Sequence, residues 1–327
     1  MNNIKTFKNF NDQDIFIFIK DNDIKSIKNY INYEYDLNIQ GSFEQTPLIY
    51  AIHKNNIKIA KLLLDAGADI DKQDSDGYTA LIEAAKNNSI KIVELLLKYN
   101  PDVDKQSNNE YTALMWAVTG NNFEISKLLL NSGADPNKLN NDIYAFHSTA
   151  LIIAAKNNNT EIVKLLLNTG ADFNQKNGHG YTVLDYAILN NNIEIVKLLL
   201  NTSLDIDKKG KYGDTALICA TYNNNTEIIK LLLDAGADID KQNNDGDTAL
   251  IYAAHINNKE IVELMLNYYA DEFILNYENK SFYDHLNDEN KQYFLYKYPT
   301  SVYNAISHWY KKSFTEFLKD YNIKNNE

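Results

Sequence analysis

The stretch that decides the fold is Thr79–Asp102, TALIEAAKNNSIKIVELLLKYNPD, because the chain repeats its pattern along most of its length. The gaps between successive threonines that align with Thr79 are 33, 33, 37, 33, 33 and 33 residues. A fixed period of this size is the signature of stacked repeats. We therefore expect each period to be one structural unit that needs its neighbours to bury its apolar surface. The aligned residues are Thr46, Thr79, Thr112, Thr149, Thr182, Thr215 and Thr248.

Each period predicts a pair of short helices. The threonine hydroxyl suits a helix N-cap, where it accepts a hydrogen bond from a free backbone N–H. Small residues such as Ala84 and Ala85 then allow close approach of a neighbouring helix. Nine residues after every threonine stands an asparagine, which tolerates the left-handed conformation and so predicts the end of the first helix. These asparagines are Asn55, Asn88, Asn121, Asn158, Asn191, Asn224 and Asn257.

The second helix of each period carries most of the apolar residues. The run from Ile92 to Leu97 is wider than one amphipathic stripe, so this helix needs cover from the units on both sides. A glycine then supplies a positive φ, and the aspartate that follows it can bond backbone N–H groups of the turn. A polar loop with glycine near its tip predicts a hairpin-like finger before the next threonine. The Gly-Ala-Asp turns are Gly67–Asp69, Gly133–Asp135, Gly170–Asp172 and Gly236–Asp238.

These residues resemble the ankyrin repeat, whose period is 33 residues and whose signature is T-P-L-H-x-A. TPLIYA at Thr46–Ala51 matches most closely, and TALIEA, TALIIA and TALIYA are variants of it. The resemblance covers about four-fifths of the chain. It implies an all-α ankyrin-repeat solenoid of stacked helix-turn-helix units with hairpin-like finger loops and helical caps.

Two departures from the family pattern have structural consequences. The signature histidine is always replaced, for example by Ile82 or Asp185, which removes the Thr–His hydrogen bond that the resemblance implies. The glycine after the second helix is replaced by Asn100, Ser203 and Tyr269. We expect strain in those three turns, most of all at Tyr269.

The period also divides the chain. It predicts a degenerate N-terminal capping repeat at 1–45, ankyrin repeats at 46–78, 79–111, 112–148, 149–181, 182–214, 215–247 and 248–280, and a degenerate C-terminal capping repeat with extra helices at 281–327. Terminal units diverge because they present a polar outer face to water.

The two ends keep traces of the pattern. Gln13 and Asn22 fall at the threonine and asparagine positions of the first unit, and Ser281 and Asn290 fall there in the last. Pro299 then breaks the chain, and one or two amphipathic helices follow it.

The period from Thr112 holds four extra residues, within Lys138–Ser148 (KLNNDIYAFHS). Long surface loops cost little free energy, so this can be a tolerated insertion. The alternative is an apolar contact loop, because Ile143, Tyr144 and Phe146 stand where polar turn residues would serve.

Composition limits the classes of partner. The formal net charge is −12, which disfavours nucleic acid, and no apolar run approaches membrane-spanning length. The chain has one cysteine, which fits a reducing compartment, and its N-terminus lacks the apolar core of a signal peptide. The excess of Asn, Ile, Lys and Tyr indicates AT-rich coding, which is common among ankyrin proteins of intracellular bacteria and giant viruses. We expect a cytoplasmic protein, including one delivered into a host cell.

No residue set predicts catalysis, a cofactor or a metal site. A thiol nucleophile needs a base and an orienting group, whereas Cys219 stands four residues after Thr215, where other units carry packing or groove residues. No two of the six histidines have the i, i+4 spacing of a zinc helix. We expect the protein not to be an enzyme.

The resemblance implies that a partner lies across the concave face made by the finger tips and the first helices. Positions four, seven and eight after each threonine share one helical face, and it mixes aromatic and polar residues as binding hot spots do. We expect Trp116, Tyr186 and Tyr222 to anchor a partner; alternatively, the tyrosines only pack between units with their hydroxyls in water. The predicted partner-binding residues are Tyr50, Tyr78, Tyr111, Trp116, Tyr144, Phe146, Tyr181, Tyr186, Tyr222 and Tyr252.

The sequence therefore predicts a monomeric, non-enzymatic scaffold that binds a protein or peptide, with no nucleic acid and no membrane as partner, and that can act as a host-directed effector. One alternative is an enzyme or a recruiting module with its active segment in the C-terminal helices. Another is a substrate of Asn/Asp hydroxylation, because 130–137 and 167–174 resemble the favoured context of that modification.

Overall fold

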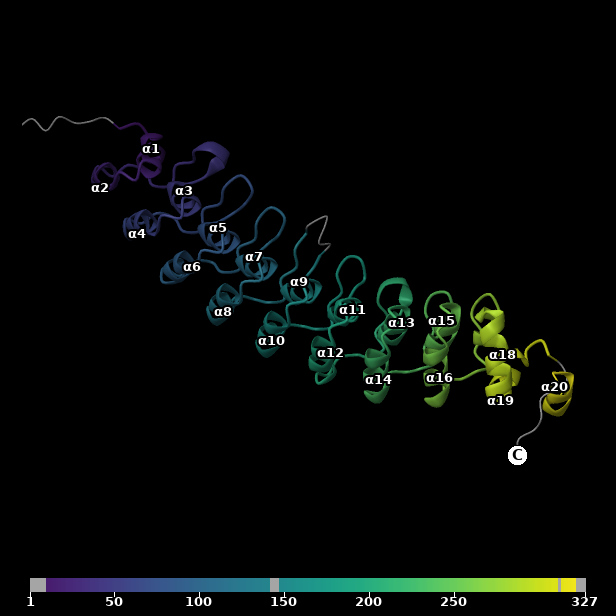
Figure 1. The fold of residues 1–327 in the computed structure, drawn as a ribbon. Helices are drawn as coiled ribbons and strands as arrows, with labels where there is room; N and C mark the ends of the chain where they lie inside the picture. Colours follow the sequence, from purple (N-terminus) through teal and green to yellow (C-terminus); the bar gives the residue numbers. More distant parts are fainter. Residues whose placement is uncertain (1–9, 142–146, 311–312, 322–327) are drawn as a thin grey trace, which may run out of the picture. The chain divides into compact units, whose positions relative to one another are not determined.

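The computed structural model describes residues 10–141, 147–310 and 313–321. By its internal contacts the chain falls into two compact units, Met1–Asp172 (unit 1) and Phe173–Glu327 (unit 2), which are described separately. In the described residues, helices are the only regular secondary structure (Figure 1). This confirms the all-α prediction.

Unit 1 contains five pairs of short α-helices. A single 3-10 turn, Ser42–Glu44, precedes α3. The helices are α1 (Asp14–Lys20), α2 (Ile24–Asn32), α3 (Pro47–His53), α4 (Ile57–Asp65), α5 (Ala80–Lys86), α6 (Ile90–Leu97), α7 (Ala113–Thr119), α8 (Phe123–Asn131), α9 (Ala150–Lys156) and α10 (Thr160–Asn168).

Unit 2 continues the alternation of helices through α18 and ends in two further helices, α19 and α20. A second 3-10 turn, Lys211–Gly213, precedes α13. The helices are α11 (Val183–Leu189), α12 (Ile193–Leu200), α13 (Ala216–Tyr222), α14 (Thr226–Asp234), α15 (Ala249–His255), α16 (Lys259–Asn267), α17 (Phe282–His285), α18 (Asp288–Lys297), α19 (Pro299–Ile306) and α20 (Phe314–Asp320).

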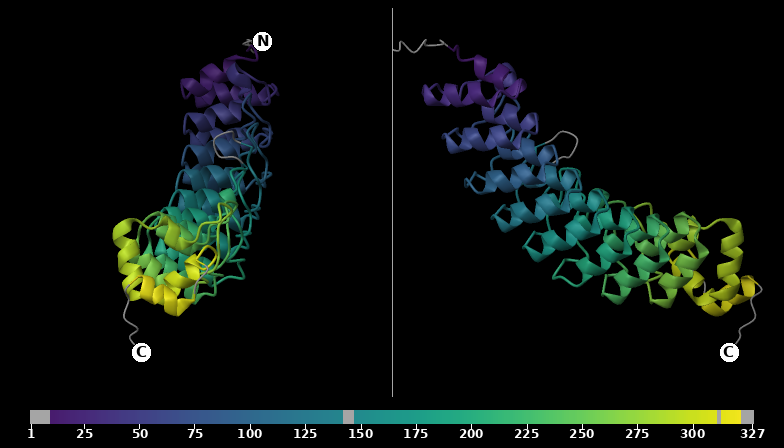
Figure 2. Two further views of the ribbon diagram at one scale, coloured as in Figure 1. Left: turned by 90° about the vertical axis from the view of Figure 1, so that its right-hand side faces the viewer. Right: turned by 60° about the vertical axis from the view of Figure 1, so that its left-hand side comes forward.

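Within each unit the helix pairs stack side by side (Figure 2). In unit 1 the first helices α1, α3, α5, α7 and α9 contact one another in sequence, and in unit 2 the first helices α11, α13, α15 and α17 do the same. The core lies between the pairs: Ile92, Val93 and Leu96 of α6 are each at most 1% exposed. The second helices are therefore covered from both sides, as their wide apolar run predicts.

The threonine N-caps are confirmed in all seven periods. Each threonine side chain accepts a hydrogen bond from the backbone N–H three residues later, as Thr79 does from Ile82 at 3.2 Å. In α11, Asp185 stands where the family signature has histidine, and it adds a second bond. Its carboxylate accepts from the Thr182 backbone N–H at 2.7 Å. That reciprocal pair is a capping box.

The asparagines that end the first helices are also confirmed. All seven have a φ between 52° and 58°, the left-handed region in which asparagine is among the least strained residues. The next residue is the N-cap of the second helix. Where this residue is asparagine, as at Asn122, its side chain accepts a hydrogen bond from the backbone N–H three residues later, here that of Ile125 at 2.9 Å. This second cap was not predicted. One Asn-Asn step thus ends one helix and begins the next.

The turns after the second helices differ from one another. Gly67 has a φ of 88°, and the substituted residues Asn100 and Tyr269 have φ values of 51° and 63°, so both are left-handed as expected. The strain falls on Tyr269, because asparagine tolerates this region. The expectation for Ser203 is wrong, because Ser203 is not left-handed. The turn there is closed by Thr202, whose backbone N–H and hydroxyl donate to the Leu199 carbonyl at 2.9 and 2.6 Å.

The finger loops are hairpin-like, as predicted, without forming strands in the described residues. In the finger before α5 the Asp74 N–H donates to the Tyr78 carbonyl at 3.0 Å, and the Gly77 N–H donates to the Asp74 carbonyl at 2.9 Å. Neighbouring fingers are joined by single backbone bonds, such as Asn108 N–H to the Asp76 carbonyl at 3.0 Å.

Side chains connect consecutive periods in two ladders. In the first, the Asp71 carboxylate accepts from the Asp102 backbone N–H at 3.0 Å. In the second, the Gln73 amide donates to the Gly77 carbonyl at 2.6 Å and to the Gln106 carbonyl of the next period at 2.8 Å. The prediction that the turn aspartates bond local N–H groups is confirmed, since Asp69 accepts from Asp71 at 2.9 Å. The bonds between periods were not predicted.

The terminal segments follow the pattern only in part. Asn22 is left-handed with a φ of 54°, and Ser281 precedes α17, with the Asp284 carboxylate accepting from its N–H and its hydroxyl at 2.8 Å. The expectation that Asn290 ends a helix is wrong. Asn290 lies inside α18, because Asn287 caps that helix by accepting the Asn290 N–H at 2.8 Å. Pro299 is the first residue of α19, so the chain break at this proline is confirmed.

We predict that Tyr269→Gly stabilises the protein. A tyrosine at a positive φ is strained, and its side chain, 91% exposed, contributes little packing in return. Glycine removes the strain at some entropic cost, for a net gain of about 0.5–1 kcal/mol in the free energy of unfolding. Chemical denaturation measures this gain. Ser203→Gly is the matched control and gives no gain, because Ser203 is not left-handed; equal gains in both variants would contradict the assignment.

We also predict that the aspartate ladder depends on hydrogen bonding and not on charge. Asn137 occupies one position of this ladder and accepts from the Asp172 N–H at 2.7 Å with an amide oxygen. Asp71→Asn should therefore change the free energy of unfolding by less than about 0.5 kcal/mol, whereas Asp71→Ala leaves the Asp102 N–H unpaired and costs about 1–2 kcal/mol. Equal losses in both variants, measured by urea titration, would show that the charge is required.

Candidate functional site

One side of the first helices is left open by the stacking. We call it the first-helix face; it carries the residues four and seven positions after each N-cap threonine. The residues at position seven are all exposed: His53, Lys86, Thr119, Lys156, Leu189, Tyr222 and His255. Those at position four are buried or half-buried: Tyr50, Glu83, Trp116, Ile153, Tyr186, Cys219 and Tyr252. Each first helix thus presents a buried or half-buried residue beside an exposed one.

In unit 1 the face carries a packed aromatic cluster. The rings of Tyr78 and Tyr111 lie 6.0 and 5.0 Å from that of Trp116, centroid to centroid. The Lys86 ammonium lies 4.3 Å from the Tyr78 ring centroid and 5.5 Å from that of Trp116. Trp116 is half-buried and its indole N–H is buried without a hydrogen-bond partner. The structure thus brings three predicted residues together and adds a lysine over them.

Tyr50 forms a smaller cluster at the start of unit 1. Its ring centroid lies 5.7 Å from that of Phe16 in α1, and the Lys54 ammonium lies 5.3 Å from the Tyr50 ring. At the C-terminal ends of two neighbouring first helices of unit 1, α3 and α5, a lysine therefore lies over a tyrosine ring. Each exposed pair of this kind contributes about 0.5–1 kcal/mol.

In unit 2, Tyr181 and Tyr186 lie together, with ring centroids 5.4 Å apart. The Asn177 amide donates to the Tyr186 hydroxyl at 3.0 Å, and burial raises the pKa of Tyr186. Tyr186 is therefore held from the finger side by a bond to its hydroxyl.

Beside them is a cavity of about 320 Å³, which we call the tyrosine pocket. Tyr222 is 63% exposed and its ring lies 5.9 Å from that of Tyr252. This volume is at the lower end of the range for ligand sites. The lining residues that matter below are Tyr181, Lys211, Tyr212, Asp214, Tyr222 and Tyr252.

Cys219 lies at the base of this pocket as a packing residue. Its thiol donates to the Asp185 carboxylate at 3.8 Å, and burial raises its pKa, with the carboxylates of Asp185 and Asp214 adding to the effect. A thiol with a raised pKa is a poor nucleophile. In the part of the chain that the structure describes, no three His, Cys, Asp or Glu side chains come together as a metal site would require.

Two predicted residues, Tyr144 and Phe146, lie outside the described residues. Among the exposed finger aromatics that were not predicted are Phe43 and Tyr212, which are 80% and 65% exposed. Both stand three residues before an N-cap threonine, a spacing that would have singled them out.

Over the described ranges, no helix has the length and apolarity needed to cross a bilayer.

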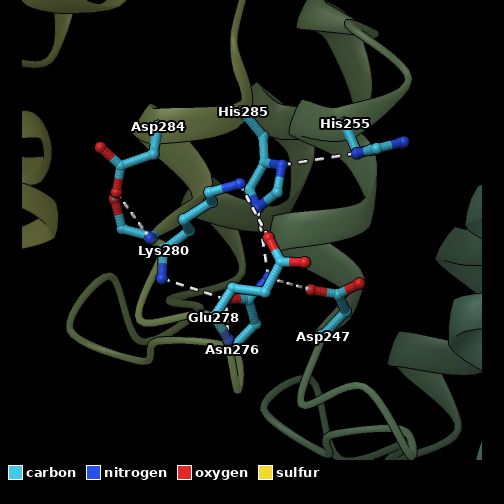
Figure 3. A network of polar contacts seen from close by, with 8 residues as sticks. Asp247, His255, Asn276, Glu278, Lys280, Asp284 and His285 are labelled. Carbon is cyan, nitrogen blue, oxygen red and sulfur yellow. Dashed lines mark hydrogen bonds and ion pairs between the residues drawn. The ribbon is translucent and has the colours of Figure 1, made fainter.

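At the far end of the first-helix face of unit 2, a chain of polar side chains reaches His255 (Figure 3). The Asn276 side-chain oxygen accepts from the backbone N–H groups of Glu278 and Lys280, both at 3.0 Å. The amide nitrogen of Asn276 must therefore be the donor to its two other partners. These are a carboxylate oxygen of Asp247, at 2.9 Å, and a ring nitrogen of His285.

The orientation of Asn276 assigns the protons on both imidazoles. His285 Nε2 lies 3.3 Å from the Asn276 amide nitrogen and so accepts from it. In the neutral ring the proton then sits on Nδ1, which donates to His255 Nδ1 at 3.4 Å. His255 therefore presents its Nε2–H to solvent on the first-helix face. Burial lowers the pKa of His285, which favours this neutral arrangement.

The lowered pKa of His285 predicts a pH dependence of stability. The unfolded histidine, with a pKa near 6.5, takes up its proton at a higher pH than the folded one does. This contribution to stability is therefore complete above about pH 6.5 and is lost as the pH falls from there through the lower pKa of the folded ring. The Asp247 and Asp284 carboxylates act in the opposite sense and reduce the effect. His285→Gln should flatten the decline of thermal stability between about pH 7.5 and 5.5.

The control for this prediction is His179→Gln, at an exposed histidine of unit 2. It should leave the pH profile of thermal stability unchanged. Nitrogen-15 shifts of the imidazoles test the proton assignment directly. A His285 ring with its proton on Nε2 at pH 8 would contradict the hydrogen-bond chain.

Comparison with known proteins agrees with this architecture. The family model described as "Ankyrin repeats (3 copies)" matches residues 15–108, 66–140, 114–210 and 203–276. The ankyrin repeat domain of Bcl-3, a member of the IkappaB family, is 27% identical with a TM-score of 0.61, over 67% of this chain and 99% of that one. The human ASB11 ankyrin repeat domain is 25% identical with a TM-score of 0.57, over 67% and 97%. A search of curated proteins gives no match. The chain belongs to the ankyrin-repeat family.

Proposed function

We propose that this protein is a non-enzymatic scaffold that binds a protein or peptide partner on the first-helix face. Ankyrin repeats are in general protein–protein interaction modules. The observation that carries the proposal here is the set of aromatic rings on this face, partly open to solvent and each beside a lysine or a second ring. Rigid aromatic residues with polar neighbours are the usual anchors of protein interfaces.

The anchors differ in how much the fold depends on them. Tyr222 is exposed at the end of α13, so removing its ring costs the folded chain little. Trp116 packs against two tyrosines and carries a lysine, so it serves stability as well as binding. We therefore assign the main binding role in unit 2 to Tyr222 and treat Trp116 as an anchor that is also structural.

We propose that the C-terminal helices cap unit 2. α17 and α18 both contact α19, which in turn contacts α20. Val302 and Ala305 of α19 and Phe317 of α20 are fully buried, which supports a covering role over a recruiting one. From composition we further propose that the protein is monomeric and acts in a cytoplasm, including that of a host cell as a host-directed effector.

The scaffold proposal is tested with Tyr222→Ala and Trp116→Ala. A partner captured from lysate is purified, and its affinity for each variant is measured by calorimetry. Tyr222→Ala should weaken binding at least about tenfold while changing the free energy of unfolding by less than about 0.5 kcal/mol. Trp116→Ala should weaken binding and also destabilise the fold by about 2–4 kcal/mol, because its ring is half-buried.

Tyr296→Ala is the matched control, since Tyr296 is 81% exposed but lies in α18, away from the first-helix face. It should leave both affinity and stability unchanged. If the partner binds Tyr222→Ala and Trp116→Ala as tightly as the unchanged protein, the binding surface lies elsewhere and the proposal fails.

A further inference from the structure

The finger before α13 holds a tyrosine in an unfavourable backbone conformation. Tyr212 has a φ of 61° and ψ of 11°, and Gly213 after it has a φ of 76°. Two successive residues with positive φ are usually an Asn-Gly pair, because bulky side chains are strained there. Tyr212 is also 65% exposed, so burial does not offset the strain. Backbone strain of this kind is concentrated at binding sites.

The Tyr212 ring already contacts a cation. The Lys211 ammonium lies 4.6 Å from the centroid of the Tyr212 ring and 5.2 Å from that of Tyr181. Both distances lie within the range of cation–π attraction. The chain's own lysine therefore shows that one wall of the tyrosine pocket can hold an ammonium group.

Two more rings line the pocket. Tyr222 and Tyr252 meet edge to face, with ring planes 73° apart. Together with Tyr181 and Tyr212 they surround the cavity of about 320 Å³ with aromatic surface. A set of aromatic rings around a small cavity is the arrangement that recognises ammonium ligands.

The charge beside the pocket favours a cation as well. The Asp214 carboxylate lines the pocket. Burial raises the pKa of Asp214, and the nearby carboxylates of Asp245 and Asp247 raise it further. Among the described residues that line the pocket, Lys211 is the one with a cationic side chain. Within the lining, the Asp214 carboxylate and the Lys211 ammonium balance each other. Asp245 and Asp247, which lie near Asp214 without lining the pocket, add negative charge beside it for a cationic partner to neutralise.

We propose that the tyrosine pocket receives a lysine side chain from a basic segment of the partner, and that Lys211 is an internal occupant that moves aside for it. This inference rests on the proposed scaffold function and names the chemistry of the partner. Tyr212 is held in its strained conformation because its ring completes the pocket. The incoming ammonium takes over the ring contacts of Lys211 and gains those of Tyr222 and Tyr252.

The experiment uses two small probes and the full chain. N-acetyl-lysine methylamide and its neutral counterpart N-acetyl-norleucine methylamide are titrated into nitrogen-15-labelled protein, and the amide shifts of α13 and its finger are followed. The lysine probe should give saturable shifts at these amides, whereas the norleucine probe should give none. Equal shifts from both probes would overturn the proposal, because the pocket would then recognise only apolar surface.

Variants separate this binding role from a structural one. Lys211→Gln removes the internal occupant and should raise the affinity for the lysine probe about two- to fivefold. Tyr212→Asn suits the turn better, so it should raise the melting temperature by roughly 2 °C while lowering the affinity at least about threefold. Weaker binding to Lys211→Gln, or unchanged binding to Tyr212→Asn, would contradict the proposal.

Phe43→Asn is the matched control. Phe43 has a φ of 56° in the corresponding turn of unit 1, so the substitution should raise stability without changing the response to the lysine probe. The outcomes also separate the two proposals. If neither probe binds but Tyr222→Ala still weakens capture of the partner, the lysine assignment fails and the scaffold function stands.

Discussion

The hydrogen bonds between consecutive helix pairs are the constraint on which the rest of the structure depends. Helices of seven to nine residues are too short to be stable alone. Each pair therefore relies on its neighbour, both for apolar cover and for partners to its loop N–H and carbonyl groups. The bond that the Asp71 carboxylate accepts from the Asp102 N–H spans 31 residues, and the bond that the Gln73 amide donates to the Gln106 carbonyl spans 33. These spans set the period of the sequence.

The same constraint explains where the period can change. The four-residue insertion lies in the sequence between Asn140 and Ser148, and these two residues are still paired: Asn140 accepts from the Ser148 N–H at 2.9 Å and donates its own N–H to the Ser148 carbonyl at 3.2 Å. The ladder bond of this period is kept: the Asn137 side chain accepts from the Asp172 N–H, and the two residues are 35 apart in the sequence. An insertion within a helix would instead shift every capping and ladder residue that follows it.

The fold could be predicted because its decisive residues act locally. A threonine N-cap, a left-handed asparagine and a turn glycine each depend on the backbone within a few residues, so their recurrence was enough. The errors arose where a neighbouring side chain offered another solution, as Thr202 does beside Ser203 and Asn287 does before Asn290. The ladders connect residues a full period apart, and only the recurring Asp-x-Gln, as in Asp71–Gln73, could have indicated them.

The candidate site was less predictable, because the ladders and caps place no demand on the first-helix face. Helical geometry located Trp116 and Tyr222 on it, but the positions of lysine ammonium groups over the rings depend on side-chain rotamers that a sequence does not specify.

Phe43 and Tyr212 were missed for a different reason: among the finger residues, only those directly before a threonine and those of the inserted loop were named, although Asn-Gly would be the most stable choice in such turns. A fold selected only for stability has no reason to hold Phe43 and Tyr212 exposed at positive φ. The strain at Tyr212 is therefore a cost to stability, and the proposed binding of a lysine side chain gives a reason for keeping it, because the Tyr212 ring lies over an ammonium group and lines the tyrosine pocket.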